Sequence, residues 1–271
     1  MRTLYLDCGM GAAGDMLTAA LLELHPDPAA FLKRMNALAI PGVEVSAAPC
    51  VKCGITGTRV TVTVNGEEEE SAEGETCRDC REHHQAHAHE HAAHHHHEKE
   101  HSHAGMHEIE HLISHLDLPE KVRSDVIAVY ALVAGAESKV HGRPVSEVHF
   151  HEVGAMDAVA DITAVCLLLH ELAPERIIAS PVHVGSGHVR CAHGVLPVPA
   201  PAAAEILRGV PIYGGAVRGE LCTPTGAALL KHFAADFAPL PVIKISGIGY
   251  GMGKKDFAWA NCVRAMIGDA E

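Results

Sequence analysis

Two histidines and three acidic residues lie close together between positions 149 and 161. His149 and His151 are two residues apart, so on an extended segment their imidazoles point to the same side. Glu152 follows, and Asp157 and Asp161 are four residues apart, which places both carboxylates on one helix face. The span predicts a divalent-metal or catalytic site, in which His149, His151, Glu152 and Asp157 act in catalysis and His149, His151 and Asp161 bind metal. The alternative is that the acidic residues cap a helix and the histidines pack in the interior.

A second histidine-bearing feature is the segment 83–111, which carries thirteen histidines. Neutral imidazole is a good ligand for nickel, zinc and copper, so this composition predicts metal binding without selecting the metal. We expect the segment to bind several nickel ions weakly. The ligands we predict within it are His94, His95, His96, His97, His101 and His103. The alternative is a solvated linker with no role of its own.

Three local patterns in and around this segment resemble further metal sites. The stretches 97–101 and 107–111 both match the zinc-protease pattern of two histidines four residues apart. His115 follows one turn later as a geometrically possible third ligand. Two copies so close together indicate that a histidine-rich composition generates the pattern by chance, so we do not predict a protease. Cys77 and Cys80 have the spacing of a metal knuckle but lack a second cysteine pair.

Two further stretches have features of anion sites. Thr223-Pro224-Thr225-Gly226 opens an expected helix, whose first backbone amides favour a phosphate group. Lys254 follows a run of alternating glycines in a basic turn. We predict that Thr223, Thr225, Gly226 and Lys254 bind a cofactor, with helix capping and a plain strand-linking loop as the alternatives.

The first glycine turn, at residues 9–15, lacks the spacing and lysine of a phosphate-binding loop, so it predicts no nucleotide site. Asp7 and Asp15, at its two ends, are either site residues or caps.

The elements that must position these residues form no regular strand–helix alternation, which favours an α+β fold with mixed sheets and packed helices. We expect strands at 2–7, 242–246 and 260–267, a hairpin or strand pair within 43–65, and short strands and turns around 177–184. We expect helices at 15–24, 28–38, 107–116, 120–141, 155–172, 199–207 and 225–237. Residues 1–65 and 106–271 would form one domain. Residues 66–105 contain no Val, Ile, Leu, Met, Phe, Trp or Tyr, so we expect a disordered acidic and histidine-rich metal-binding insertion.

The composition restricts location and partners. The formal charge is −13, of which residues 66–111 supply −10 through thirteen acidic and three basic side chains. This balance argues against nucleic acid and favours cations. No apolar run approaches the roughly 20 residues of a membrane helix, and the start has no signal-peptide pattern. Nine scattered cysteines indicate reduced thiols and hence a cytoplasmic protein.

The chain resembles the LarC family, the pyridinium-3,5-bisthiocarboxylic acid mononucleotide nickel insertion proteins. The resemblance covers nearly the whole chain and rests on several motifs together. These are LYLDCGMGAAGDM at 4–16, VHFHEVGAMDAVADI at 148–162, HGVLPVPAPA at 193–202, TPTGAAL at 223–229 and GYGMGKKD at 249–256. One departure is Gly9-Met10, where the family tends to have bulkier or hydroxyl residues.

The resemblance implies insertion of Ni²⁺ into a sulfur-bearing pyridinium mononucleotide, which gives the nickel-pincer cofactor of lactate racemase. It also implies CTP hydrolysis with Mn²⁺ or Mg²⁺, and CTP binding by a C-terminal domain that follows the region matched here. The chain is then the N-terminal part of a nickel insertase of the lyase class, and by itself it can be inactive. Expected partners are the C-terminal half, the mononucleotide, apo lactate racemase and further copies in a homo-oligomer. The alternatives are a nickel store or chaperone that acts through its histidines, and a metal-dependent hydrolase.

Overall fold

The computed structural model of the chain describes residues 1–68, 105–147, 156–191 and 194–271. His149, His151 and Glu152 lie outside the described residues. So do the cysteine pair at 77 and 80 and the predicted metal ligands of the insertion, namely His94, His95, His96, His97, His101 and His103. These predictions therefore stay predictions.

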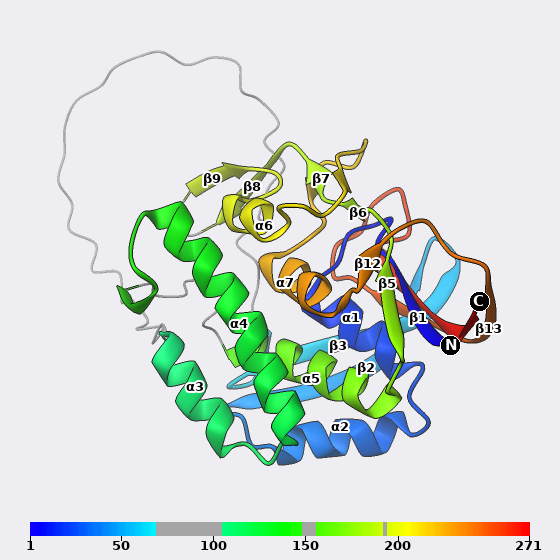
Figure 1. The fold of residues 1–271 in the computed structure, drawn as a ribbon, viewed down its shortest axis with the longest axis horizontal. Coiled ribbons are helices and arrows are strands. Elements are labelled where there is room, and N and C mark those ends of the chain that lie inside the picture. The colour runs from blue at the N-terminus through cyan, green and yellow to red at the C-terminus, as the bar shows by residue number, and fades with distance from the viewer. Residues whose placement is uncertain (69–104, 148–155, 192–193) are drawn as a thin grey trace.

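A mixed eight-stranded sheet forms the centre of the fold (Figure 1). Its order is β12 (Asp236–Phe237), β5 (Arg176–Ala179), β1 (Arg2–Asp7), β14 (Cys262–Ala270), β13 (Ile243–Met252), β3 (Ile55–Val64) and β2 (Val43–Lys52), with β4 (Glu67–Glu68) also paired to β3. β1 runs parallel to β5 and antiparallel to β14. The sheet is thus built from the two ends of the chain and one central segment, and it confirms the α+β prediction.

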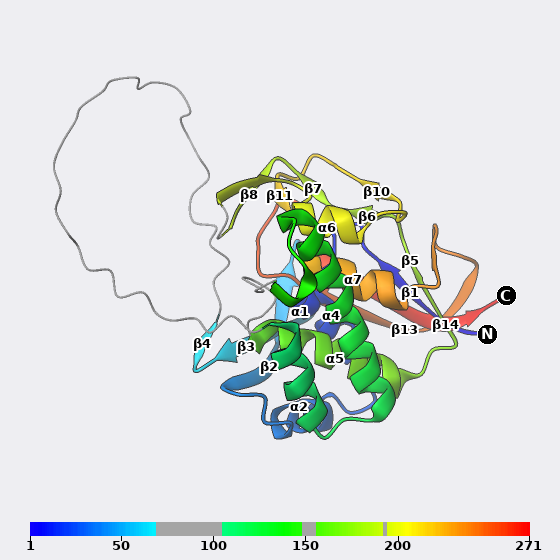
Figure 2. The ribbon, with the colours of Figure 1, turned by 60° about the vertical axis from the view of Figure 1, so that its left-hand side comes forward.

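Helices cover one face of this sheet in successive layers (Figures 1 and 2). They are α1 (Gly14–Leu22), α2 (Pro28–Ala37), α3 (Met106–His115), α4 (Glu120–His141), α5 (Met156–Leu172), α6 (Pro201–Ile206) and α7 (Pro224–Phe233), with a 3₁₀ turn, η1 (Val145–Glu147), after α4. α1 packs on β13, β3 and β14, α5 packs on α1, and α4 packs on α5, α6 and α7. α5 is apolar on nearly all sides, as expected of a helix enclosed by other elements.

Short strands connect the sheet to α6 and α7. They are β6 (Val182–His183), β7 (Gly185–Ser186), β8 (His188–Cys191), β9 (Gly194–Pro197), β10 (Ile212–Tyr213) and β11 (Gly219–Glu220), and they pair as three two-stranded sheets. Each of these strands has two to four residues, so this region depends on packing against the rest of the domain.

α1 lies directly on the backbone of β13. A methyl group added to Gly251 would sit 1.8 Å from the carbonyl oxygen of Met16, and one added to Gly249 would sit 2.1 Å from that of Ala20. Both distances are far below van der Waals contact, so only glycine permits this approach. The alternating glycines of the GYGMGKKD motif therefore bring α1 against the sheet, and α1 carries Asp15.

Several expected boundaries are corrected. The C-terminal helix was expected to reach residue 237, but α7 ends at Phe233 and Asp236–Phe237 pair with β5. β13 extends to Met252, well beyond the expected 242–246. Residues 66–68 were assigned to the disordered insertion, yet Glu67 and Glu68 form β4 against Thr63 and Val64. In each case pairing within the sheet overrides the local composition. The prediction for 120–141 is confirmed by α4.

The two ends of the chain lie side by side, since Arg2 pairs with Asp269 in the sheet. Within the part of the chain that the structure describes, no helix combines the length and the apolar character needed to cross a bilayer.

Candidate functional site

Three carboxylates from two helices gather at the N-terminal ends of α1 and α5. Asp157 and Asp161 lie one turn apart on α5, as predicted, and Asp15 lies in the first turn of α1. A methyl group added to Gly14 would be only 2.7 Å from Oδ2 of Asp161, so this glycine permits the close approach. The charges interact, because both Asp15 and Asp157 raise the pKa of Asp161. We call Asp15, Asp157 and Asp161 the carboxylate cluster.

Asp161 is the most perturbed member of the cluster. Burial raises the pKa of its carboxyl group well above the ordinary value, and the neighbouring Asp15 and Asp157 raise it further. A backbone N–H of Asp15 donates to this carboxyl group and partly offsets the shift. The other oxygen, Oδ1, is buried and has no hydrogen-bond partner. Asp161 therefore binds one end of α1 and leaves an acceptor oxygen available to a proton or a cation.

Two basic side chains face the cluster from the sheet side. Burial raises the pKa of Asp15, while Lys254 and Arg59 act in the opposite direction. Lys254 also lowers the pKa of Asp161. Lys254, predicted from sequence as a cofactor-binding residue, is thus placed beside the predicted metal-binding residue Asp161. This combination of anionic and cationic groups suits a ligand that has both a metal ion and a phosphate.

The start of the insertion is connected to the same place. Glu68, in the last described strand before residue 69, accepts from Lys254 Nζ at 3.0 Å and from Arg59 at 2.9 Å. Burial alone would raise the pKa of Glu68, but these two cations hold it below its usual value. The described chain before residue 69 therefore ends beside the cationic side of the carboxylate cluster.

Lys52 fixes the loop that carries Lys254. Its side chain is only 8% exposed, and its Nζ donates to the carbonyl oxygens of Lys254 and Lys255 and to Asp256 Oδ1, at 3.4, 3.0 and 2.5 Å. The ammonium group thus holds three consecutive residues of the GKKD turn. Such hydrogen bonds from a charged donor are stronger than neutral ones.

We expect Lys52→Met to lower the free energy of unfolding by about 1–3 kcal/mol, because the methionine keeps the apolar stem but removes a charged donor from two carbonyl groups, of which that of Lys255 keeps only the Asn261 amide. Urea unfolding followed by circular dichroism would measure this. The matched control is Asp256→Asn, which removes the negative charge of the exposed partner but keeps an acceptor oxygen, and it should change stability little. Equal losses for both variants would show that the ion pair, rather than the carbonyl contacts, stabilises the turn.

The carboxylate cluster does not form a complete metal site by itself. Across residues 1–68, 105–147, 156–191 and 194–271, no group of three or more His, Cys, Asp or Glu side chains is arranged to hold a metal ion. α5 begins at Met156, four residues after Glu152 in the sequence. A metal site that uses Asp157 and Asp161 therefore needs ligands beyond the described residues or from the substrate.

The start of α7, where we predict an anion site, carries a helix cap in the structure, and the binding of an anion there stays a prediction. Thr223 is the N-cap, and its hydroxyl oxygen accepts from the backbone amide of Gly226 at 3.2 Å. The Thr223 amide donates to the carbonyl oxygen of Ala12, and the two threonine hydroxyls at 223 and 225 are 3.1 Å apart. A methyl group on Gly226 would lie 2.1 Å from the same Ala12 oxygen. These contacts use two amides that a phosphate would need, and they pack α7 against the turn before Asp15.

A second polar centre lies on the turn that follows β1. Asp7 accepts from Arg264 at 2.6 Å beside a cavity of about 200 Å³ that Tyr250 and Cys262 also line. His183 is 6% exposed, and its Nδ1 is 3.0 Å from the carbonyl oxygen of Gly9. The imidazole stacks on Tyr213 with ring centroids 4.7 Å apart. Asp7 Oδ1 also accepts from the Gly9 amide at 3.2 Å, so Asp7 caps the turn and pairs with Arg264 at the same time. His183 belongs to this second polar centre.

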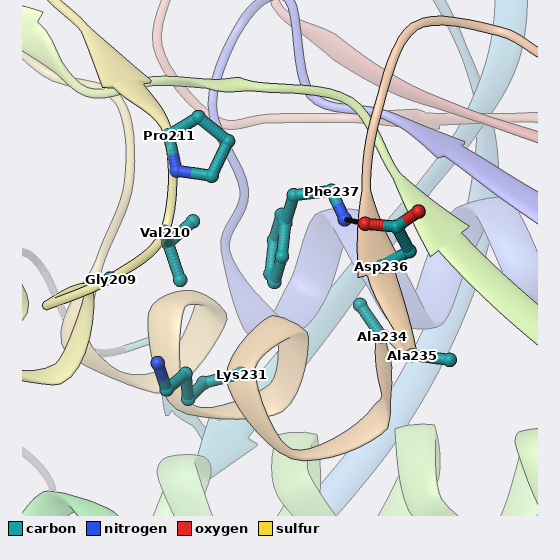
Figure 3. Close-up of a pocket in the computed structure, with 8 residues that line it drawn as sticks. All are labelled: Gly209, Val210, Pro211, Lys231, Ala234, Ala235, Asp236 and Phe237. Atoms are coloured by element: carbon teal, nitrogen blue, oxygen red, sulfur yellow. Dashed lines mark hydrogen bonds between the residues drawn. The ribbon is translucent and has the colours of Figure 1, made fainter.

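A larger cavity, of about 340 Å³, lies between the turn at 209–211 and the end of α7 (Figure 3). Phe237 faces Val210 and Pro211 across it, while the carboxylate of Asp236 turns back to its neighbour's amide. Lys231 donates to the carbonyl oxygen of Arg208 at 2.7 Å. None of the residues predicted to act lines this cavity, so its size does not make it the candidate site.

Sequence reasoning missed much of the surroundings of the carboxylate cluster. Arg59, Glu68 and Lys52 were not singled out, and Asp15 was left between site residue and cap. Tyr130 is fully buried in α4, and burial together with Asp157 and Asp161 raises its pKa well above the usual value. The one sequence feature that could have indicated a role for Asp15 in the site is its position directly after a glycine turn. The sequence did not indicate that α1 and α5 would meet.

A family model described as nickel insertion protein matches residues 4–271. The chain therefore belongs to the nickel insertion protein family. Proteins named pyridinium-3,5-bisthiocarboxylic acid mononucleotide nickel insertion protein are 39%, 40% and 41% identical to it, in Geobacillus kaustophilus, Clostridium kluyveri and Clostridium acetobutylicum.

These relatives match 99–100% of this chain, whereas the matched region makes up 60%, 63% and 65% of their own lengths. The chain thus spans less than two thirds of the relatives. No solved structure matches it.

Proposed function

We propose that this chain is the metal-handling part of an insertase that places Ni²⁺ in pyridinium-3,5-bisthiocarboxylic acid mononucleotide. The observation that carries the proposal is the carboxylate cluster, with its free Asp161 oxygen beside Lys254. The names of the relatives supply the substrate. Nickel is a substrate here, together with the mononucleotide.

The chemistry requires a positioned metal and a base. Bonding of Ni²⁺ to two thiocarboxylate sulfurs and a ring carbon replaces a C–H bond, so one proton must leave the ring. In our proposal Asp161 and the predicted ligands His149 and His151 hold the ion, and Asp157 or one of the histidines accepts the proton. Lys254 and Arg59, which pair with Glu68 in the structure, supply positive charge for the anionic groups of the mononucleotide in this proposal.

CTP and its Mn²⁺ or Mg²⁺ fit this chain poorly. The turn at 9–15 has no lysine for phosphates, and two amides at the start of α7 bond within the protein. We therefore place CTP in the C-terminal half of the longer family proteins and treat that half as a partner of this chain. A cytoplasmic location, a homo-oligomer and delivery to apo lactate racemase remain further predictions.

Alanine substitutions test the proposal. We expect His149→Ala, His151→Ala and Asp157→Ala each to slow nickel insertion by about 10²-fold or more, because they remove a ligand or a base from a fixed geometry. The assay contains the C-terminal half, the mononucleotide, CTP and excess Ni²⁺. His95→Ala and His96→Ala are the matched controls and should retain the wild-type rate, since neighbouring histidines replace a lost one. Wild-type rates for the first three folded variants would overturn the proposal.

A further inference from the structure

A second arrangement of imidazoles lies on α3, outside the carboxylate cluster. His107, His111 and His115 follow one another at intervals of four residues and are all exposed. Ile109 and Ile113, on the opposite face, are fully buried in the core. The helix is therefore fixed by its apolar face and presents a stripe of imidazoles to solvent.

Two of these rings are close neighbours. The ring centroids of His111 and His115 are 4.4 Å apart with an interplanar angle of 41°. Residues four apart on a helix lie one above the other, so one ion can contact both rings without any change of backbone. His107 lies one turn further towards the N-terminus, and the structure records no ring contact for it with His111.

The hydrogen bonds of His115 determine which ring nitrogen is available. Nδ1 is 2.7 Å from the carbonyl oxygen of His111, which also accepts from the hydroxyl of Ser114 at 2.7 Å. A carbonyl oxygen only accepts, so Nδ1 carries the proton of the neutral ring. The lone pair is then on Nε2. Metal-binding histidines are oriented in the same way, by donating their other ring N–H to a carbonyl group.

We propose that Nε2 of His115 and a ring nitrogen of His111 bind one divalent late-transition-metal ion, such as Ni²⁺, with water in the remaining positions. Two ligands make a site that is weak and open, which suits exchange of the ion rather than its permanent storage. α3 also packs against η1, whose last residue, Glu147, precedes His149 by two positions. This contact brings α3, as an element, against the last described residues before position 148. The proposal stands independently of the insertase function.

The experiment measures protection of individual imidazoles by Ni²⁺ alone in the full chain. Diethyl pyrocarbonate acylates free imidazole nitrogen, and mass spectrometry resolves the modified positions. In the wild type, Ni²⁺ should protect His111 and His115. His111→Gln should raise the Ni²⁺ concentration needed to protect His115 by about tenfold or more, since loss of even an orienting partner weakens metal sites by about 10–100-fold.

The controls separate the pair from other histidines. His170→Gln removes a lone exposed histidine near the end of α5, and His107→Gln removes the remaining member of the stripe. Both should leave the protection of His115 unchanged, and Mg²⁺ should protect none of these rings, because it prefers oxygen ligands. Unchanged protection of His115 in His111→Gln overturns the proposal. Protection of His115 that is weakened in His107→Gln instead of in His111→Gln overturns it as well.

Discussion

Asp161→Asn should slow nickel insertion by about 10²-fold or more and yet make the metal-free protein more stable at pH 7. Asparagine has the same shape as aspartate, and its carbonyl oxygen can still accept from the Asp15 amide. It removes a buried charge that Asp15 and Asp157 both disfavour. A group that costs stability and is needed for activity is expected at a functional site.

The pH dependence gives this prediction a second readout. Because the pKa of Asp161 is raised in the folded protein, the fold holds this proton at pH values where the unfolded chain has lost it. Wild-type stability should therefore fall as pH rises from about 4, the ordinary pKa, up to the raised pKa. Each unit of the shift corresponds to about 1.36 kcal/mol. The variant should show a smaller fall, with the residual slope arising from Asp15, whose pKa is also raised.

Urea unfolding between pH 4 and pH 8 with a chelator present would measure both effects. Asp161→Ala is the control, because it removes the charge and also the acceptor for the Asp15 amide. It should be less stable than Asp161→Asn at every pH. If Asp161→Asn has the wild-type slope and full insertion activity, the side chain only caps α1.

Gly251→Ala should destabilise the protein by about 3 kcal/mol or more. Its added carbon would lie 1.8 Å from the Met16 carbonyl oxygen and 2.6 Å from the Ala20 amide nitrogen. Both atoms belong to the backbone, so a change of side-chain rotamer cannot relieve the clash. The helix α1 must therefore move away from the sheet. Overpacking commonly costs about 1–3 kcal/mol, and a backbone contact lies at or above the upper end.

Gly135→Ala is the matched control. Gly135 lies in α4, is exposed, and has nothing within 4 Å of an added methyl group. Alanine should stabilise the helix by about 0.5–1 kcal/mol. Thermal unfolding should therefore shift in opposite directions for the two variants. A small shift of the same sign for both would mean that α1 does not press on β13.

The sequence predicted the local parts of the candidate site and not its assembly. The four-residue spacing of Asp157 and Asp161 was enough to place both on one helix face, because helical periodicity is a local property. Their meeting with Asp15 depends on the packing of α1 on α5, which Gly14 permits by lacking a side chain, while Gly249 and Gly251 permit the packing of α1 on β13. An absent side chain leaves no hydrophobic pattern from which such a contact can be predicted.

The predicted element boundaries were wrong where residues with a low strand propensity pair with the sheet. Ala234 and Ala235 favour helix, yet the Ala235 amide donates to Ile177 and the chain continues as β12. Glu67 and Glu68 looked like part of an acidic insertion, but Arg59 and Lys254 neutralise Glu68 beside β3. In both cases a partner distant in the sequence supplies the decisive contact. The same limitation explains why Thr223 was correctly identified as a possible cap while the bonds of its helix to Ala12 were not foreseen.

The direct contact of α1 with β13 also has a consequence for motion. With backbone against backbone and no side chain between them, α1 cannot slide or tilt without opening the sheet. Its amides should therefore exchange with solvent about as slowly as those of β13, in the most protected unit of the protein. Asp15 belongs to that rigid unit, so any rearrangement that admits a metal or a nucleotide to the carboxylate cluster has to come from the side of α5 and of the loop that carries Lys254.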